Sequence, residues 1–404
     1  MEHEEYDIII VGAGPAGCTC AYQLAGSGLK IAILEKDIFP RDKICGDALS
    51  TDVINQFSWM NPDLAQQFQK LVSKTTSRGV RVFSASNQSL DVSLNNLKSS
   101  GYVARRTDFD NFYFNQLNNL PDIRIFQGHK VIDVNSFEDG VILKTDKSTF
   151  RAQIVVGADG ANSIINRKLI GKQIDKAHHM AGLRQYFENV SGFHEDHIEL
   201  HFYKELVPGY FWIFPLPNGQ ANVGLGMLSS TVSKKQINLK QKLQDIIQNH
   251  PNVRHRFKNA KPLESIKGFG LPLGSRKRQC SGNRFLLLGD AAGLIDPFTG
   301  EGIANAIRSG RIAAEHLRKA FQLNRFDSEY NSLFDKEIYS KMWSELLMGR
   351  SLQKLSTYPQ IFNFLINKGN TNESVRALFT SMLDNVDLKK KLLKPSFYLK
   401  LFFS

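Results

Sequence analysis

The chain has 404 residues, of which 42% are hydrophobic and 22% charged, a composition typical of a soluble globular protein with two or three domains. No apolar run approaches the roughly 18 residues of a transmembrane helix, and the four cysteines imply no disulfide framework. The net charge of +12 indicates attraction to an anionic surface, and because no nucleic-acid-binding motif is present we favour a membrane surface over nucleic acid.

The chain begins with a short polar segment, Met1 to Glu5, and the first predicted strand follows at once. This arrangement leaves no room for a signal peptide. We therefore expect a cytoplasmic protein, and the positive charge extends that expectation to peripheral contact at the inner face of the membrane.

The stretch from Tyr6 to Glu35 predicts a strand, a tight turn, a helix and a second strand. An apolar β-branched run leads into Gly12, Gly14 and Gly17, which have the spacing G-x-G-x-x-G, and the second strand ends on Glu35. This order is typical of a dinucleotide site. The alternative is an ordinary glycine-rich turn between a strand and a helix, and this stretch alone does not decide between FAD and NAD.

Each residue type in the stretch has a physical role in binding a dinucleotide. Gly12 permits the tight turn, Gly14 lets a pyrophosphate approach the backbone, and Gly17 lets the helix pack on the strand. The helix N-terminus attracts the phosphate charge, and the acid at the end of the second strand accepts from a ribose hydroxyl. The predicted cofactor-binding residues here are Gly12, Ala13, Gly14, Pro15, Ala16, Gly17, Glu35 and Lys36.

The remaining elements follow from hydrophobic periodicity and turn residues. The pattern predicts a helical segment over 51–77, a strand over 78–83, a loop over 84–100, a helix over 109–117 and strands over 123–126, 130–134, 141–145 and 154–156. Alternating strands over 180–187, 197–202, 210–214 and 222–227 predict an antiparallel sheet. A helix over 234–249, a buried strand over 285–288, a long helix over 303–321 and a basic helical remainder complete the chain.

A second glycine-rich stretch follows the strand at 285–288. Its glycines let the backbone approach a flat ligand, and the helix beginning near Glu301 points its N-terminus at that ligand. A helix N-terminus suits the anionic ring of a reduced flavin. The predicted contacts are Gly289, Asp290, Gly300, Gly302 and Ile303. The alternative is a loop that serves packing alone.

Three motifs occur in order: Gly12-Ala-Gly14-Pro-Ala-Gly17, Gly157-Ala-Asp159-Gly160 and Gly289-Asp290-Ala-Ala-Gly293. Together they resemble the flavoprotein family with the p-hydroxybenzoate hydroxylase-type fold. The resemblance implies that Glu35, Arg106 and Asp290 contact the ribose, the pyrophosphate region and the ribityl chain of FAD, with Asp159 and Gly160 also at the cofactor. Arg106 opens an R-x-x-F-D pattern; the alternative is an ordinary surface arginine at a helix start.

The resemblance implies an α/β fold: a Rossmann-like FAD-binding domain of the glutathione reductase type with an inserted antiparallel substrate-binding sheet and a helical C-terminus. The expected FAD-binding domain comprises residues 1–75, 101–170 and 268–325. The expected substrate-binding domain comprises 76–100 and 171–267, and residues 326–404 form the helical C-terminal region.

Two further elements narrow the resemblance to the geranylgeranyl reductases. Residues 40–46 match P-x-x-x-x-C-G, and residues 210–215 with 224–226 match Y-x-W-x-F-P followed by G-x-G. The match implies catalytic residues Cys45 and Gly46, with Cys45 also at the cofactor. It implies substrate-binding residues Tyr210, Trp212, Phe214, Pro215, Gly224 and Gly226. The chain departs from the family at Asp47, where those reductases usually carry glycine.

This resemblance implies reduction of an isolated C=C bond in a polyprenyl lipid or isoprenoid quinone chain. Hydride would come from N5 of the reduced flavin and a proton from the Cys45 side. From the residues alone, Cys45 could equally be a small buried side chain, and the aromatic face of Tyr210, Trp212 and Phe214 could be plain core. If that face lines a pocket, it suits a long apolar substrate.

Only one dinucleotide fingerprint is present, so we expect reducing equivalents from transient docking of NAD(P)H or of a reduced electron-carrier protein. No metal site is expected, because the histidines have no metal-ligand spacing. The tail over 388–404 mixes lysine with leucine and phenylalanine. It could lie on an anionic bilayer or dock on the body as a terminal helix.

Two rival functions remain at this point. The first is an FAD-dependent monooxygenase or halogenase on the same fold; a halogenase would want W-x-W-x-I-P, and this chain has Tyr210 and Phe214 where that element carries Trp and Ile. The second is a non-enzymatic flavoprotein that shuttles electrons or binds lipid.

Overall fold

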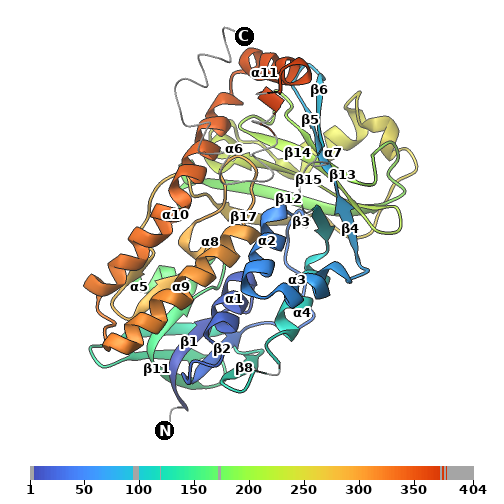
Figure 1. Ribbon diagram of the computed structural model, residues 1–404. Helices are drawn as coiled ribbons and strands as arrows, with labels where there is room; N and C mark the ends of the chain where they lie inside the picture. Colours follow the sequence, from blue (N-terminus) through green and yellow to red (C-terminus); the bar gives the residue numbers. More distant parts are fainter. Residues whose placement is uncertain are drawn as a thin grey trace.

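The computed structural model describes residues 4–93, 100–118, 120–171, 174–373, 375, 376 and 379. Its strands form three sheets, two of them large. Figure 1 shows the sheet that contains β1, β2 and β11 at the lower end of the molecule and the sheet that contains β12, β14 and β15 at the upper end. The long helix α10 (Ser328–Leu355) runs along one side between the two ends.

The first sheet has the strand order β18-β19-β11-β1-β2-β8, and β10 and β9 add to it through β11. Its centre is parallel, because β1 pairs in parallel with both β11 and β2. Ile8, Ile9 and Ile10 are fully buried, as expected for a parallel sheet covered on both faces. The strands are β1 (Glu4–Val11), β2 (Ile31–Glu35), β8 (Ile123–Gln127), β9 (Val131–Ser136), β10 (Val141–Thr145), β11 (Thr149–Gly157), β18 (Ser281–Gly282) and β19 (Phe285–Leu287).

The second sheet has the order β16-β12-β15-β14-β13-β5-β6, and β17 also pairs with β12. All strand pairs in this order are antiparallel, as predicted, except β13 and β5, which are parallel. The strands are β5 (Gly79–Phe83), β6 (Ser89–Ser93), β12 (His179–Glu188), β13 (His197–His201), β14 (Gly209–Leu216), β15 (Gln220–Leu228), β16 (Lys261–Pro262) and β17 (Lys267–Pro272).

A small third sheet has the order β3-β7-β4 and is antiparallel. Its strands are β3 (Ala48–Leu49), β7 (Gly101–Ala104) and β4 (Lys74–Ser77). Because β3 begins directly after residues 40–47, this sheet anchors one end of the loop that carries Cys45.

The helices pack against both large sheets. Where α1 (Pro15–Leu24) meets α9 (Ile303–Leu323), a Cβ on Gly310 would lie only 2.6 Å from the Ala16 carbonyl oxygen, so the two backbones are nearly in contact. The other helices are α2 (Thr51–Met60), α3 (Pro62–Gln69), α4 (Arg106–Asn115), α5 (Ile164–Leu169), α6 (Ser229–Lys235), α7 (Leu239–Asn249), α8 (Gly289–Ala292) and α11 (Pro359–Thr371), with 3-10 turns at Lys176–His178 and Arg254–Phe257.

Three local predictions were wrong. The helix expected over 51–77 is two helices and strand β4, because Pro62 cannot continue α2 and Asn61 caps α3 by accepting from the Asp63 N–H at 2.9 Å. The loop expected over 84–100 contains β6, which pairs with β5. The helix expected over 234–249 is interrupted at Gln236, whose φ is +52°.

The fold class expected from the sequence is confirmed: a mixed α/β protein with an antiparallel sheet inserted between two parts of a parallel one and helices at the C-terminal end. The residue boundaries between domains stay a prediction. Within the described residues, none of the helices has both the length and the apolar character needed to cross a membrane. The tail over 388–404, for which we expected a membrane or docking role, lies outside the described residues.

Candidate active site

A cavity of about 1270 Å³ reaches from the carboxyl ends of β1 and β2 to the aromatic face of the second sheet. It brings together most of the residues predicted at the cofactor, at the reaction centre and at the substrate. Those that line it are Gly12, Gly14, Pro15, Ala16, Glu35, Lys36, Cys45, Gly46, Arg106, Asp159, Gly160, Tyr210, Trp212, Phe214, Gly226, Asp290, Gly300, Gly302 and Ile303.

Five predicted site residues are not among those that line the cavity. Ala13 donates its backbone N–H to Glu35 Oε2 at 2.7 Å, and Gly289 donates to Ser309 Oγ at 3.0 Å. Gly17 and Gly224 lie where side chains would collide with their neighbours, and Pro215 is buried within β14. These five residues therefore pack behind the residues that line the cavity.

The first glycine turn is as tight as its sequence predicts. Gly12 has φ of +101°, and a Cβ there would lie 2.5 Å from the Ala158 carbonyl oxygen. A Cβ on Gly17 would lie 2.0 Å from the Gly12 carbonyl oxygen. The N-terminus of α1 has no side-chain cap, so its first-turn N–H groups are available to an anion.

Glu35 ends β2 with its carboxylate fixed by the backbone. Oε2 accepts from the Ala13 N–H at 2.7 Å, Oε1 accepts from the Asp37 N–H at 3.0 Å, and the side chain is buried while still lining the cavity. The acid therefore holds the glycine turn in place as well as facing the cavity, a role that motif spacing did not reveal.

Arg106 is buried in an ion-pair cluster at the start of α4, which rules out the alternative of an ordinary surface arginine. Its Nε and Nη2 both donate to Asp110 at 2.7 Å, and Arg41 Nη1 donates to the same carboxylate at 2.5 Å. Burial raises the pKa of Asp110, but the two arginines outweigh that effect and hold it below its usual range. Two cations on one carboxylate leave positive charge facing the cavity, which suits a pyrophosphate.

The residues around this half of the cavity fit FAD. Burial raises the pKa of the Asp159 carboxyl, whose Oδ2 accepts from the Ile164 N–H at 2.7 Å while its buried Oδ1 has no partner. A Cβ on Gly160 would meet nothing within 4 Å, so the backbone there is open. Asp290 pairs with Lys43 Nζ at 3.0 Å at the cavity wall. These groups together match a dinucleotide. They are the glycine backbone, the uncapped start of α1, the unpaired carboxylate oxygen of Asp159 and the flanking cations.

The aromatic face owes its shape to the strand beside it. Tyr210, Trp212 and Phe214 of β14 pair with Gly226, Gly224 and Asn222 of β15. A Cβ on Gly224 would lie 2.3 Å from Trp212 Cζ2, so the second glycine motif makes room for the indole. The aromatic face therefore lines the cavity and is not plain core, although its rings also contact one another.

The aromatic face lies beside the second glycine-rich loop. The Tyr210 hydroxyl donates to the Thr299 carbonyl, and a Cβ on Gly300 would lie 3.3 Å from that hydroxyl. Burial raises the pKa of Glu301 to about 7, and its Oε1 accepts from the Ala304 N–H at 2.8 Å at the start of α9. The loop expected at the flavin ring and the face expected at the substrate are thus neighbours.

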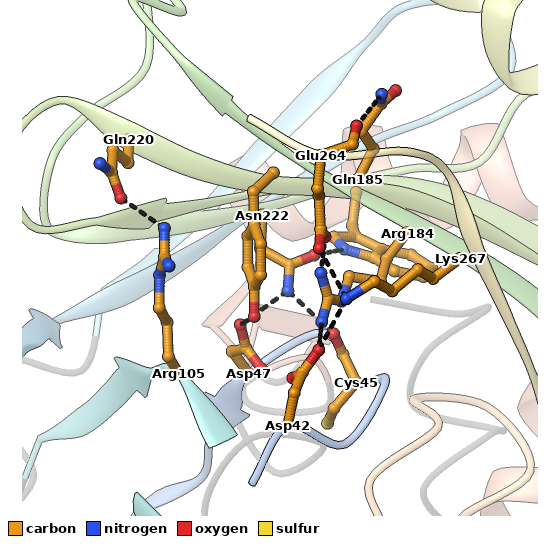
Figure 2. Close-up of polar contacts among 12 residues, drawn as sticks. Asp42, Cys45, Asp47, Arg105, Arg184, Gln185, Gln220, Asn222, Glu264 and Lys267 are labelled. Carbon is orange, nitrogen blue, oxygen red and sulfur yellow. Dashed lines mark hydrogen bonds and ion pairs between the residues drawn. The ribbon is translucent and has the colours of Figure 1, made fainter. Parts of the chain in front are cut away.

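The loop with Cys45 and Gly46 lies between these two sides. A Cβ on Gly46 would lie 3.0 Å from Phe214 Cε2, so the loop backbone rests on the aromatic face. Asn222 Nδ2 donates to the Cys45 carbonyl at 2.8 Å, as Figure 2 shows. Burial raises the pKa of the Cys45 thiol, which keeps it neutral at physiological pH.

Sequence reasoning missed the polar network behind this loop. Arg184 is fully buried and contacts Asp42 at 2.7 Å and Glu264 on its two sides, with Lys267 beside them (Figure 2). Part of this signal is in the sequence, because Arg184 and Asn222 are polar residues that follow apolar ones within the strands β12 and β15. Among the described residues, no group of three or more His, Cys, Asp or Glu side chains could hold a metal ion.

A parallel sheet with glycine-rich turns at its carboxyl edge, joined by one cavity to an inserted antiparallel sheet, defines an FAD-dependent oxidoreductase. The chain belongs to the family whose model is described as FAD binding domain, which matches residues 5–322.

Relatives with established names agree with this class. The digeranylgeranylglycerophospholipid reductase of Methanosarcina acetivorans is 29% identical over 352 residues, covering 84% of this chain and 81% of the relative. The menaquinone reductase of Mycobacterium tuberculosis is 26% identical over 374 residues, covering 88% and 85%. The resemblance to the geranylgeranyl reductases is thereby confirmed, as are FAD and the assignment to the oxidoreductases.

Solved structures confirm the fold. A geranylgeranyl bacteriochlorophyll reductase-like protein of Thermoplasma acidophilum has a TM-score of 0.81 at 24% identity and covers 99% of both chains. The halogenase PltM, solved with phloroglucinol and FAD, has a TM-score of 0.75 at 17% identity and covers 95% of this chain and 89% of its own. Similarity at this level shows a shared fold and carries no further argument for halogenation.

Proposed function

We propose that this protein reduces isolated C=C bonds in the polyprenyl chain of a lipid or isoprenoid quinone. The observation that carries the proposal is the single cavity in which the Cys45 loop lies between the cofactor side and the aromatic face. The names of the relatives support it, since digeranylgeranylglycerophospholipid and menaquinone both contain isoprenoid chains.

We infer distinct roles for the two ends of the cavity. The glycine turns, Glu35, Arg106, Asp159 and Asp290 hold FAD, which when bound and reduced supplies hydride. Tyr210, Trp212 and Phe214 hold the apolar chain and exclude water. Each of these three residues is at most 7% exposed, so little water contacts them before the chain binds.

The chemistry of an isolated alkene explains why a proton donor belongs between the two sides. Such a bond is not polarised, so hydride addition without a coincident proton would leave a bare carbanion. Cys45 lines the cavity as a neutral thiol and can give its proton from Sγ at that moment. Gly46 lets the loop that carries the thiol lie flat against Phe214.

The proposal predicts that the purified protein is yellow and saturates polyprenyl chains. Anaerobic, reduced protein mixed with a geranylgeranyl lipid or with menaquinone should give products heavier by one H₂ per saturated bond, measured by mass spectrometry. Protein with oxidised FAD is the control and should give none. Colourless protein that refuses FAD would end the proposal, and oxygenated products with a long-lived adduct after mixing with O₂ would favour the monooxygenase alternative.

We also propose that the reducing equivalents come from NAD(P)H or a reduced electron-carrier protein that docks transiently. The support is a sequence observation, the single G-x-G-x-x-G fingerprint. Bleaching of the bound FAD by NADH, by NADPH or by a reduced ferredoxin-type carrier identifies the donor.

Peripheral contact with the membrane follows from the substrate class and the net charge of +12. We propose that residues 388–404 provide part of that contact through their mixture of lysine and apolar side chains. Removing the residues after Asp387 should reduce co-sedimentation with anionic liposomes several-fold and with neutral liposomes by less, because only the lysine contribution depends on lipid charge. Equal sedimentation of both proteins with anionic liposomes would contradict this.

A further inference from the structure

Asp47 is held in an unfavourable state that its contacts must offset. It is fully buried, and its φ of +69° lies in the region that favours glycine. A buried carboxylate also loses its hydration. A glycine would avoid both costs, so the carboxylate requires an explanation beyond the path of the chain.

One carboxylate oxygen, Oδ2, belongs to a hydrogen-bond network that includes Asn222 (Figure 2), whereas the buried Oδ1 has no hydrogen-bond partner among the described residues. Its Oδ2 accepts from the Tyr186 hydroxyl at 2.6 Å and from Asn222 Nδ2 at 2.9 Å. The same Asn222 nitrogen gives its second hydrogen to the Cys45 carbonyl, and Asn222 Oδ1 accepts from Trp212 Nε1 at 2.9 Å. Because every polar atom of this amide is used, its orientation is fixed and it ties Asp47 to the loop carrying the thiol.

The charged groups around the thiol oppose one another. Burial has the largest effect and raises the pKa of the Cys45 thiol, and the Asp47 carboxylate raises it further. Arg106, the backbone N–H of Asp47 and Lys43 lower this pKa and so favour the thiolate. Burial raises the pKa of Asp47 to about 6, so the carboxylate is charged at neutral pH. The titratable and charged groups facing the pair are Arg184 and Tyr186 of β12, Arg106 of α4, Tyr210 of β14 and Lys43 of the same loop.

We propose that Asp47 is a positioning residue that keeps the Cys45 thiol protonated, through its negative charge and through the Asn222 amide that it shares with the Cys45 carbonyl. The importance of Asp47 for turnover rests on the proposed function. In that reaction the proton leaves Cys45 Sγ for one alkene carbon while hydride from the reduced cofactor reaches the other carbon. The thiolate left beside a carboxylate is destabilised by like charge, and after the saturated product has left it takes a proton from solvent water, which releases hydroxide to the bulk.

The test is the pH dependence of Cys45 alkylation by iodoacetamide in FAD-loaded, substrate-free protein, followed by peptide mass spectrometry. Asp47→Asn removes the charge and keeps a side-chain acceptor, and Asp47→Gly also removes the side chain at a φ that glycine tolerates. Both should lower the midpoint of alkylation by about one pH unit. Tyr186→Phe is the matched control, because it removes one hydrogen bond to the same carboxylate and no formal charge, and its midpoint should stay with the wild type.

Two results would overturn the inference. Coincident midpoints for the wild type and Asp47→Asn would show that the carboxylate does not set the charge state of the thiol. An equal shift in Tyr186→Phe would show that loosening of the loop is responsible. The alkylation assay contains no substrate, so its result does not depend on the proposed function. If the midpoint shifts but the protein saturates no polyprenyl chain, the proposed function is refuted and the effect of Asp47 on the thiol stands.

Discussion

Replacing Cys45 with alanine is expected to lower the rate of double-bond reduction by about 10²- to 10⁴-fold while FAD stays bound, the usual effect of losing a positioned proton donor. The thiol lines the cavity beside Gly46 and Phe214, and alanine offers no proton there. Since the Cys45 carbonyl, not its side chain, accepts from Asn222, the loop should keep its place in the variant. The loss should therefore appear in kcat with little change in KM.

Single-turnover kinetics of pre-reduced protein measures this step directly, because it removes the electron donor from the rate. Cys280→Ala is the matched control: that cysteine is buried, does not line the cavity, and should leave the single-turnover rate near that of the wild type. Undiminished reduction by Cys45→Ala with FAD in place would show that another group delivers the proton.

The local parts of the site were predictable from the sequence. Strand β1, the glycine turn, helix α1 and the acid at the end of β2 lie within one short stretch, so residue types and spacing specify them together. The loop around Gly300 was predictable for the same reason. The glycines at 224 and 226 were recognised by resemblance. The structure shows why glycine is needed there, because the strand register places them opposite Trp212 and Tyr210.

The polar network around Cys45 could not be predicted, because its partners are far apart in the chain. Asn222 and the Cys45 carbonyl are 177 residues apart, and Arg184 and Asp42 are 142 apart. Their meeting depends on how the inserted sheet seats on the first one. The sequence marks them only as polar residues in apolar strands, which predicts burial with a partner and leaves the partner open.

Gly17→Ala should be the most damaging single-methyl change at the cofactor site. Its Cβ would lie 2.0 Å from the Gly12 carbonyl oxygen and 3.2 Å from Ile10 Cγ2, both on the strand and turn that α1 packs against. Backbone cannot give way as a flexible side chain can, so α1 has to shift and its N-terminus leaves the pyrophosphate position. We expect the free energy of unfolding to fall by about 3 kcal/mol, the upper part of the range for overpacking, together with loss of bound FAD.

Gly26→Ala provides the comparison that isolates this collision. Gly26 has φ of +73° and nothing within 4 Å of a Cβ, so alanine there adds backbone strain alone, about 1 kcal/mol, and should keep FAD. Urea unfolding monitored by circular dichroism gives the two stabilities, and the flavin absorbance of the purified proteins gives occupancy. Gly17→Ala protein that is yellow and as stable as Gly26→Ala would contradict the close packing of α1 on the Gly12 turn, and with it the placement of FAD along that turn.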